Sequence, residues 1–130
     1  MKLLDQYVAM HKAGLFKGKS ALKSFPTFAE HFKRLGCKTY LDYGCGAGWQ
    51  YDRWHVHKDH GLPKPRWRYD PAVSAYAIKP PRRASFDAVF CSDVLEHVPE
   101  FELGGVLYDL FSYPTKLLVV TVCTRPAKKK

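Results

Sequence analysis

The feature of the sequence that most constrains its fold is a glycine-rich loop directly after a short apolar run. Residues 39–43 are β-branched, aromatic or aliphatic around one acid, Asp42, and Gly44, Gly46 and Gly48 follow at alternate positions. Glycine permits a tight turn and a close approach of the backbone to a ligand. A helix that begins after the loop would direct its unpaired N–H groups at that ligand. The segment therefore predicts a strand, a turn and a helix, the layout of a nucleotide or nucleoside cofactor site.

Two later segments stand at distances that fit the same site. Arg68, Tyr69 and Asp70 end a second predicted strand. Its carboxylate lies roughly 20 residues beyond the loop, where an acid on the neighbouring strand reaches ribose hydroxyls. Residues 86–91 form a third predicted strand, and the segment 92–99 follows it. Because ligands of open α/β sheets bind outside the carboxyl ends of the strands, all three segments point to one crevice.

At these residues the chain resembles the class I S-adenosylmethionine-dependent methyltransferases, and among them the type 11 group. Residues 41–48 match the first motif of that family, Asp70 matches its ribose-binding acid, and residues 86–99 match its strand-four motif. The resemblance covers residues 39–122 as a fold. It implies an α/β, Rossmann-like, doubly wound and mostly parallel sheet with helices on both faces. It also implies bound S-adenosylmethionine and transfer of its methyl group to a nucleophile.

The resemblance assigns cofactor contacts position by position. The loop glycines would lie against the methionine end of the cofactor, and Asp42 would hold that end through water or its amino group. Asp70 would take the ribose, and the segment from Cys91 to Asp93 would face the cofactor across the crevice. The complete set of expected contacts is Asp42, Gly44, Cys45, Gly46, Gly48, Asp70, Pro71, Cys91, Ser92 and Asp93.

Few catalytic groups are required by this chemistry. A sulfonium methyl group is already activated, so binding and in-line orientation can supply much of the rate. A base helps only where the acceptor has a proton to lose. Asp93 and His97 are the candidates, and His97 also fits a structural role in the segment after the third predicted strand.

Other nucleotide-dependent classes fit the residues less well. Nicotinamide dehydrogenases space their glycines as Gly-x-Gly-x-x-Gly, whereas the sixth position here is Trp49. The tripeptide 18–20 is Gly-Lys-Ser, as at the end of a phosphate-binding loop, but Ala13 occupies the position of the required upstream glycine. DNA amino-methyltransferases place an Asn/Asp-Pro-Pro-aromatic motif where residues 91–94 read Cys-Ser-Asp-Val. That subclass is therefore disfavoured.

Patterning divides the chain into three parts. Residues 1–38 carry two apolar stripes at helical spacing and are expected to form N-terminal helices, with residues 16–20 as a lid over the cofactor. Gly36 is predicted to end the second of these helices. Residues 39–122 form the S-adenosylmethionine-binding core, and residues 123–130 form a basic tail.

The predicted core is shorter than the resemblance implies. Residues 71–85 leave room for only a vestigial third strand and contain no acid for an adenine contact, so Tyr76 or the backbone would replace it. Residues 100–111 have helical spacing, and residues 116–122 read as an apolar strand of a parallel sheet. The sheet is expected to lack the last strands of the usual methyltransferase, through truncation or natural minimisation. Its uncovered edge predicts self-association or cover by a partner subunit.

Composition excludes several classes of protein. With 130 residues, 46% of them hydrophobic, the chain is one small domain. No apolar run reaches the length of a membrane span, and the first residues lack the apolar region of a signal peptide. The four cysteines have no Cys-x-x-Cys spacing, as expected of reduced thiols in a cytoplasmic protein. His55, His57 and His60, with Asp59, lack a second ligand pair, so no metal site is predicted.

The formal net charge of +9 bears on partners rather than on fold. Basic residues gather in segments 12–38, 58–68 and 79–83, with tryptophans among or near them. Such patches suit nucleic acid, and a solvated basic surface is the alternative. Three hypotheses follow: a methyltransferase with an unidentified acceptor; a non-catalytic cofactor- or nucleic-acid-binding domain derived from one; and an enzyme that degrades S-adenosylmethionine.

Overall fold

The computed structural model describes residues 19–123. The first predicted helix, the lid as far as residue 18 and the basic tail from residue 124 lie outside the described residues. The elements follow one another as α2 (Lys19–Arg34), β1 (Tyr40–Tyr43), α3 (Trp49–Asp52), α4 (Val56–Asp59), β2 (Trp67–Tyr69), the 3-10 turn η1 (Ser74–Tyr76), β3 (Phe86–Ser92), the 3-10 turn η2 (Leu95–His97), α5 (Glu100–Ser112) and β4 (Pro114–Thr121).

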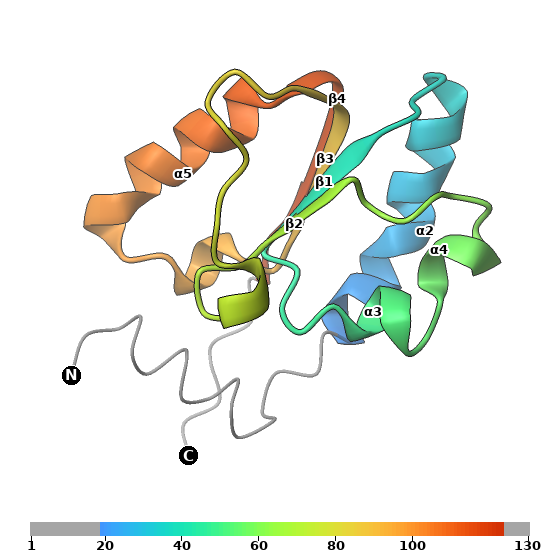
Figure 1. Ribbon diagram of the computed structural model, residues 1–130, viewed down its shortest axis with the longest axis horizontal. Helices are drawn as coiled ribbons and strands as arrows, with labels where there is room; N and C mark the ends of the chain where they lie inside the picture. The colour runs from blue at the N-terminus through green and yellow to red at the C-terminus, as the bar shows by residue number, and fades with distance from the viewer. Residues whose placement is uncertain (1–18, 124–130) are drawn as a thin grey trace.

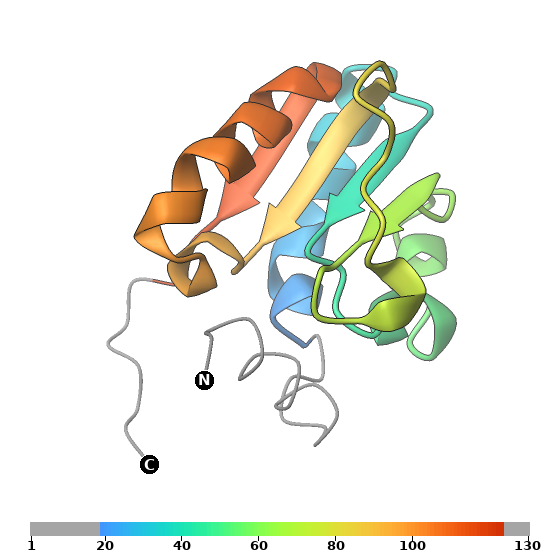
Figure 2. The ribbon, with the colours of Figure 1, turned by 60° about the vertical axis from the view of Figure 1, so that its left-hand side comes forward.

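The four strands form one parallel sheet in the order β2-β1-β3-β4. Figure 2 shows the four strand arrows side by side and pointing the same way. The chain moves outward from β1 to β2 and then crosses back to β3 on the other side of β1. Because crossovers between parallel strands are right-handed, this reversal places helices on both faces. Figure 1 shows α2, α3 and α4 on one face and α5 on the other. The predicted α/β class is confirmed, and the arrangement is compatible with a Rossmann-like fold.

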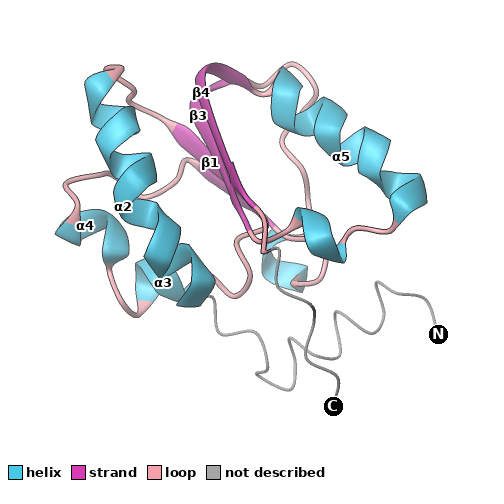
Figure 3. Ribbon diagram, turned by 180° about the vertical axis from the view of Figure 1, so that it is seen from behind, coloured by secondary structure: helices cyan, strands magenta, loops and turns pink. Residues whose placement is uncertain are grey.

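An aromatic core joins α2 to the sheet. Figure 3 shows from behind that α2 lies along one face of the sheet. Phe25, Phe28 and Phe32 recur at helical spacing and are buried against Tyr40 and Phe90. The ring centroids of Phe28 and Phe90 are 4.8 Å apart, and those of Phe28 and Tyr40 are 5.2 Å apart. Tilted aromatic pairs at these distances add to the stabilisation from buried area. This stripe therefore fixes α2 across β1 and β3.

Gly36 ends α2 as the sequence predicts. Its φ of +66° lies in the left-handed region, where a side chain would be strained. The Cys37 N–H then donates to the Phe32 carbonyl at 2.9 Å, which satisfies one of the last helical acceptors. The turn delivers the chain directly to the start of β1.

The crossover from β2 to β3 contains no strand among residues 70–85, only the turn η1. It runs along the same face of the sheet as α5 (Figure 1). Two side chains hold its backbone: Trp67 Nε1 donates to the Ile78 carbonyl at 2.9 Å, and the Tyr113 hydroxyl donates to the Pro80 carbonyl at 2.8 Å. The predicted loss of a full third strand is confirmed.

The outer edge of β4 is unpaired within residues 19–123, as the sequence predicts. No helix in this part of the chain combines the length and apolar character that a membrane crossing would need.

Candidate functional site

The glycine loop turns sharply at the carboxyl end of β1, and its shape is set by close contacts with its neighbours. Gly44 has a φ of +93°, and a Cβ there would collide with the side chain of Val94. At Gly48, with φ +78°, a Cβ would lie 2.9 Å from Nη1 of Arg68. Position 44 therefore requires glycine because of packing against Val94, and position 48 requires it because of its positive φ. The first contact joins the segments that follow β1 and β3.

Asp70 fixes the loop from the neighbouring strand end. Its side chain is only 1% exposed. Oδ2 accepts a hydrogen bond from the Gly46 N–H at 2.9 Å, and Oδ1 accepts one from the Ala72 N–H at 2.9 Å. The Gly44 N–H also donates to the Tyr69 carbonyl at 2.6 Å. The acid predicted to bind ribose thus also holds the glycine loop against the end of β2.

Asp42 is a buried carboxylate on the opposite face of β1 from Tyr43. Its Oδ2 accepts hydrogen bonds from the Tyr51 hydroxyl at 2.5 Å and from Gln50 Nε2 at 3.1 Å. Burial raises the pKa of Asp42 to about 6, although these two hydrogen bonds lower it in part. Among the described residues no cation forms an ion pair with it. A carboxylate in this state would be stabilised by a positively charged ligand group.

A cavity of about 490 Å³ lies beside the loop at the carboxyl end of the sheet, on the α5 face. The strand ends, the crossover, the turn after β3 and α5 all contribute to its wall. Its lining residues are Tyr43, Gly44, Tyr69, Asp70, Pro71, Lys79, Val94, His97, Val98, Pro99, Phe101, Glu102, Gly105, Val106 and Asp109. The position is the one where open α/β sheets bind ligands, next to the reversal between β1 and β3.

Three polar groups of the cavity wall form a connected set. Asp109 Oδ2 accepts a hydrogen bond from the Tyr43 hydroxyl at 2.7 Å and pairs with Lys79 Nζ at 2.9 Å. Burial and this carboxylate raise the pKa of Tyr43. The pKa of Tyr69 is raised to about 12 by burial, with Asp109 and Asp70 adding to the effect. The phenols therefore stay neutral and can act as hydrogen-bond donors or acceptors.

The expected contacts divide between the cavity and the surrounding structure. Gly44, Asp70 and Pro71 line the cavity, and so does the candidate base His97. The remaining loop positions and Asp42 lie in or beneath the loop instead of on the cavity wall.

The residues expected to face the cofactor from β3 do not reach the wall. Cys91 is fully buried in the core cluster on the α5 face, so its side chain cannot face a cofactor as expected. Ser92 Oγ lies 2.9 Å from both Ser24 Oγ and Thr121 Oγ1. The Asp93 N–H donates to the Thr121 carbonyl at 2.8 Å. These two positions join β3 to α2 and β4, away from the cavity.

The wall formed by α5 was not predicted, although one sequence signal pointed to it. The Gly104–Gly105 pair lowers the helical propensity of α5, which has no obvious benefit for the helix. Gly105 lines the cavity, and a Cβ there would meet nothing within 4 Å. A longer side chain at this position would fill space that is now open. Tyr43, Lys79 and Asp109 had no local sequence signal, because only the fold brings them together.

Charges at this end favour a cationic ligand. Asp70, Glu102 and Asp109 line the cavity. Two neighbouring cations are already neutralised: Lys79 by Asp109, and Arg68 by two hydrogen bonds to Asp52 at 2.6 and 3.0 Å. Because α3 is a four-residue helix, its dipole offers little to a phosphate group.

The histidines near α4 do not assemble into a metal site. Within residues 19–123, no group of three or more His, Cys, Asp or Glu side chains is placed to hold a metal ion. His57 is buried with its Nδ1 unpaired, and burial lowers its pKa. His55 is exposed.

Comparison with known proteins finds no relative: no family model matches the chain, and neither does any curated protein or solved structure.

Proposed function

We propose that this chain binds S-adenosylmethionine at the carboxyl end of its sheet and is a methyltransferase acting on an unidentified acceptor. The observation that carries the proposal is the meeting of a glycine loop, a ribose-type acid and an acid-lined cavity at the reversal between β1 and β3. In this reading the sheet is a methyltransferase sheet without its last strands. The four unpaired cysteines support a reducing, cytoplasmic setting.

Charge supports S-adenosylmethionine over a dinucleotide. The cofactor carries a sulfonium and an ammonium group, whereas a dinucleotide carries a pyrophosphate. Asp70 and Glu102 line the cavity beside the Lys79–Asp109 ion pair, whose two charges cancel, so two negative charges remain. A pyrophosphate would meet repulsion from these acids without a free cation to offset it.

The donor and acceptor groups fit the parts of this cofactor. Asp42 is buried beneath the glycine loop, off the cavity wall and in no ion pair with a described residue, so its negative charge would attract an ammonium group on the loop without touching it. Each oxygen of Asp70 accepts one backbone hydrogen bond and has a second lone pair for a ribose hydroxyl. Val98, Phe101 and Val106 provide apolar wall for a nucleobase.

The bound cofactor would supply an activated methyl group, and the chain would mainly orient the reactants. The loop backbone would position the methionine end, and the α5 wall would exclude water. His97 lines the cavity and is therefore the better placed candidate to accept a proton from an acceptor. Asp93 does not line the cavity, and both its backbone N–H and its carboxylate contact Thr121, which favours a structural role.

One observation favours the alternative of a non-catalytic domain derived from a methyltransferase. Asp42 and Asp70 both make hydrogen bonds within the chain, so the motif residues also have a purely structural use. A domain could keep them for its fold after losing activity.

The test is a calorimetric titration of S-adenosylhomocysteine into the wild-type chain and into Gly105→Leu and Gly104→Leu. Both variants add the same side chain to the same helix, but only Gly105 lines the cavity. We expect one-site binding that Gly105→Leu weakens at least tenfold, or about 1.4 kcal/mol, and that Gly104→Leu leaves unchanged.

The absence of binding to a folded wild-type chain would overturn the cofactor proposal. Where binding is found, an acceptor screen with S-adenosylmethionine separates the remaining hypotheses. Turnover that depends on acceptor supports a methyltransferase, turnover without acceptor supports a degrading enzyme, and binding without turnover supports the non-catalytic domain.

A further inference from the structure

Exposed basic residues gather at the amino end of the sheet, opposite the cavity. They come from the end of α2, the approaches to β1, β2 and β3, and the first residues of β4. Because parallel strands start at the same edge, the topology brings these segments to one face. We call this the basic face; its residues are Lys33, Lys38, Arg66, Arg82, Arg83 and Lys116, all of them exposed.

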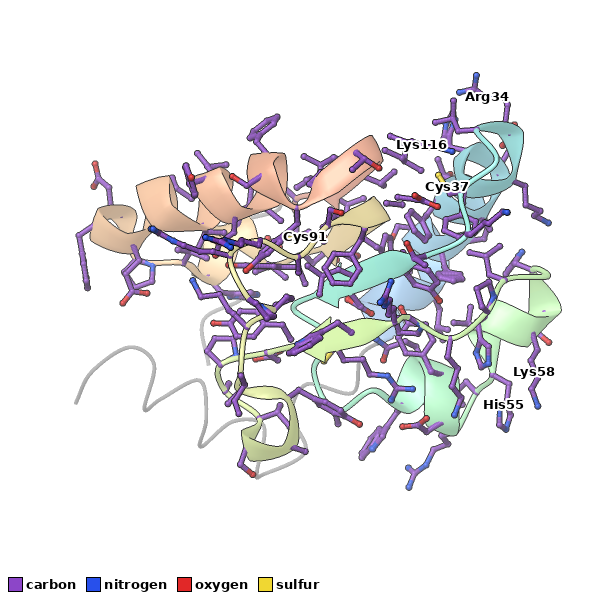
Figure 4. The ribbon with its side chains drawn as sticks, turned by 45° about the horizontal axis from the view of Figure 1, so that its top comes forward. Arg34, Cys37, His55, Lys58, Cys91 and Lys116 are labelled. Carbon is purple, nitrogen blue, oxygen red and sulfur yellow. The ribbon has the colours of Figure 1, made fainter. Side chains whose placement is uncertain are left out.

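Hydrogen bonds and close contacts join these segments. The Lys38 N–H donates to Asp87 Oδ2 at 2.7 Å, which links the starts of β1 and β3. The Arg66 N–H donates to the Tyr40 carbonyl at 2.9 Å, which places the approach to β2 beside β1. Lys116 lies near Cys37. Burial raises the pKa of the Cys37 thiol, and the positive charge of Lys116 offsets part of that rise. Figure 4 shows Cys37, Lys116 and Arg34 together at one end of the molecule.

Within residues 19–123, the basic side chains of the basic face form no ion pair. The ion pairs of the described residues involve Lys64, Arg68 and Lys79, none of which belongs to the basic face. Arg82 and Arg83 are the central residues of a turn closed by a 2.9 Å hydrogen bond from the Ala84 N–H to the Pro81 carbonyl. The side chains of both arginines are exposed on this turn.

The basic face extends across all four strands of the sheet. In sheet order, it runs from Arg66 before β2 and Lys38 before β1 to the Arg82–Arg83 turn before β3 and Lys116 in β4. Neighbouring strands lie about 4.8 Å apart, so the four strand starts span ~14 Å. A duplex advances ~3.4 Å per base pair along its axis, so a face of this length spans about four base-pair steps and the phosphates that flank them.

We propose that the basic face binds the phosphate backbone of a nucleic-acid duplex. Three of its six residues are arginines, whose planar fork suits phosphate oxygens. The charges come from turns and strand starts, whereas binding to a membrane surface usually uses one amphipathic helix. The contacts are to the backbone, so binding is independent of base sequence. The basic face does not depend on the cofactor proposal.

The test measures fluorescence anisotropy of a labelled duplex over a series of salt concentrations. The first variant is Arg82→Glu with Arg83→Glu. The matched control is Lys23→Glu with Lys58→Glu, two exposed residues outside the basic face; Figure 4 shows Lys58 apart from Lys116. Both variants lower the formal net charge of +9 by the same amount, so only the position of the change differs.

For the wild-type chain we expect log K to fall with log salt at a slope of about −3.6, for four phosphates at about −0.9 each. The Arg82/Arg83 variant should bind at least tenfold more weakly with a slope shallower by about 2, and the control should lose much less. Titration with S-adenosylhomocysteine should give the same result in both variants. Three results would each overturn the proposal: an equal loss of duplex affinity in both variants, no duplex binding in ~0.1 M salt, or preferential binding to phosphatidylserine vesicles.

Discussion

The two ends of one sheet differ in charge and in the way they are built. At the carboxyl end, buried carboxylates hold backbone groups, and a cavity is lined by three acids. At the amino end, exposed basic side chains project from turns, and none of the basic face forms an ion pair with a described residue. Within residues 19–123, acidic groups therefore gather at one end of the sheet and basic groups at the other, which the net charge of +9 does not reveal. Total charge describes neither end, and each end suits a ligand of the opposite sign.

The largest expected difference between the two ends is in the stability lost when a carboxylate is removed: Asp70 at the carboxyl end and Asp87 at the amino end. Asp70→Ala leaves two buried N–H donors without partners, those of Gly46 and Ala72. At about 1–3 kcal/mol for each donor, we expect a loss of about 2–6 kcal/mol in the free energy of unfolding. Asp87→Ala removes an exposed hydrogen bond to Lys38 and should cost about 1 kcal/mol. Urea unfolding of both variants checks the comparison, and equal costs would show that the two ends are held alike.

The buried charge of Asp42 should lower the stability of the free chain, and a cationic ligand group should offset that loss. Its pKa is raised from 3.8 to about 6, so the folded state binds more protons than the unfolded state between these values. The contribution of this group to stability therefore falls as the pH rises from about 4 to about 6, by about 3 kcal/mol in all. Asp42→Asn keeps an acceptor for Tyr51 and should stabilise the chain at pH 7 by about 1–3 kcal/mol.

The same substitution should weaken binding of S-adenosylhomocysteine, because it removes a negative charge beneath the glycine loop that would attract the ammonium group. Unfolding curves from pH 4 to pH 8 and a titration at pH 7 measure the two effects. A variant that is less stable at pH 7 and binds as well as wild type would contradict this account of Asp42.

A smaller effect is expected at the glycine pair of α5. Gly104 and Gly105 each have open space where a Cβ would be. Gly104→Ala and Gly105→Ala should each stabilise the helix by about 0.5–1 kcal/mol. Thermal unfolding measures the gain. A loss of stability at Gly105 alone would indicate a contact of that glycine which the structure does not contain.

The smallest effect concerns His57. Burial lowers its pKa, so the folded state favours the neutral ring. Its contribution to stability is present above about pH 6.5, the ordinary histidine value, and is lost as the pH falls through that range. Titration of the ring by NMR should give a pKa below 6.5. A midpoint at or above the ordinary value would show that the ring is hydrated or paired.

Much of the sheet could be predicted from local patterns. The strand at Tyr40–Tyr43, the glycine turn and the end of α2 at Gly36 follow from residue types that the backbone itself requires. The site depended on contacts between distant segments. Alternation along β1 places Asp42 and Tyr43 on opposite faces, but only the packing of α3 and α5 decides which of them borders the cavity. Cys91 was misplaced for the same reason, since its burial depends on the cover that α5 provides.

The contact between Gly44 and Val94 has a mechanical consequence. These residues belong to the segments after β1 and β3, and they touch with no room for an added methyl group. A ligand resting on the glycine loop would press through Gly44 on Val94. The His97 N–H donates to the Val94 carbonyl at 2.9 Å, so the displacement would continue into the turn that carries the candidate base. The glycine loop and the turn that carries His97 are therefore connected through Gly44 and Val94.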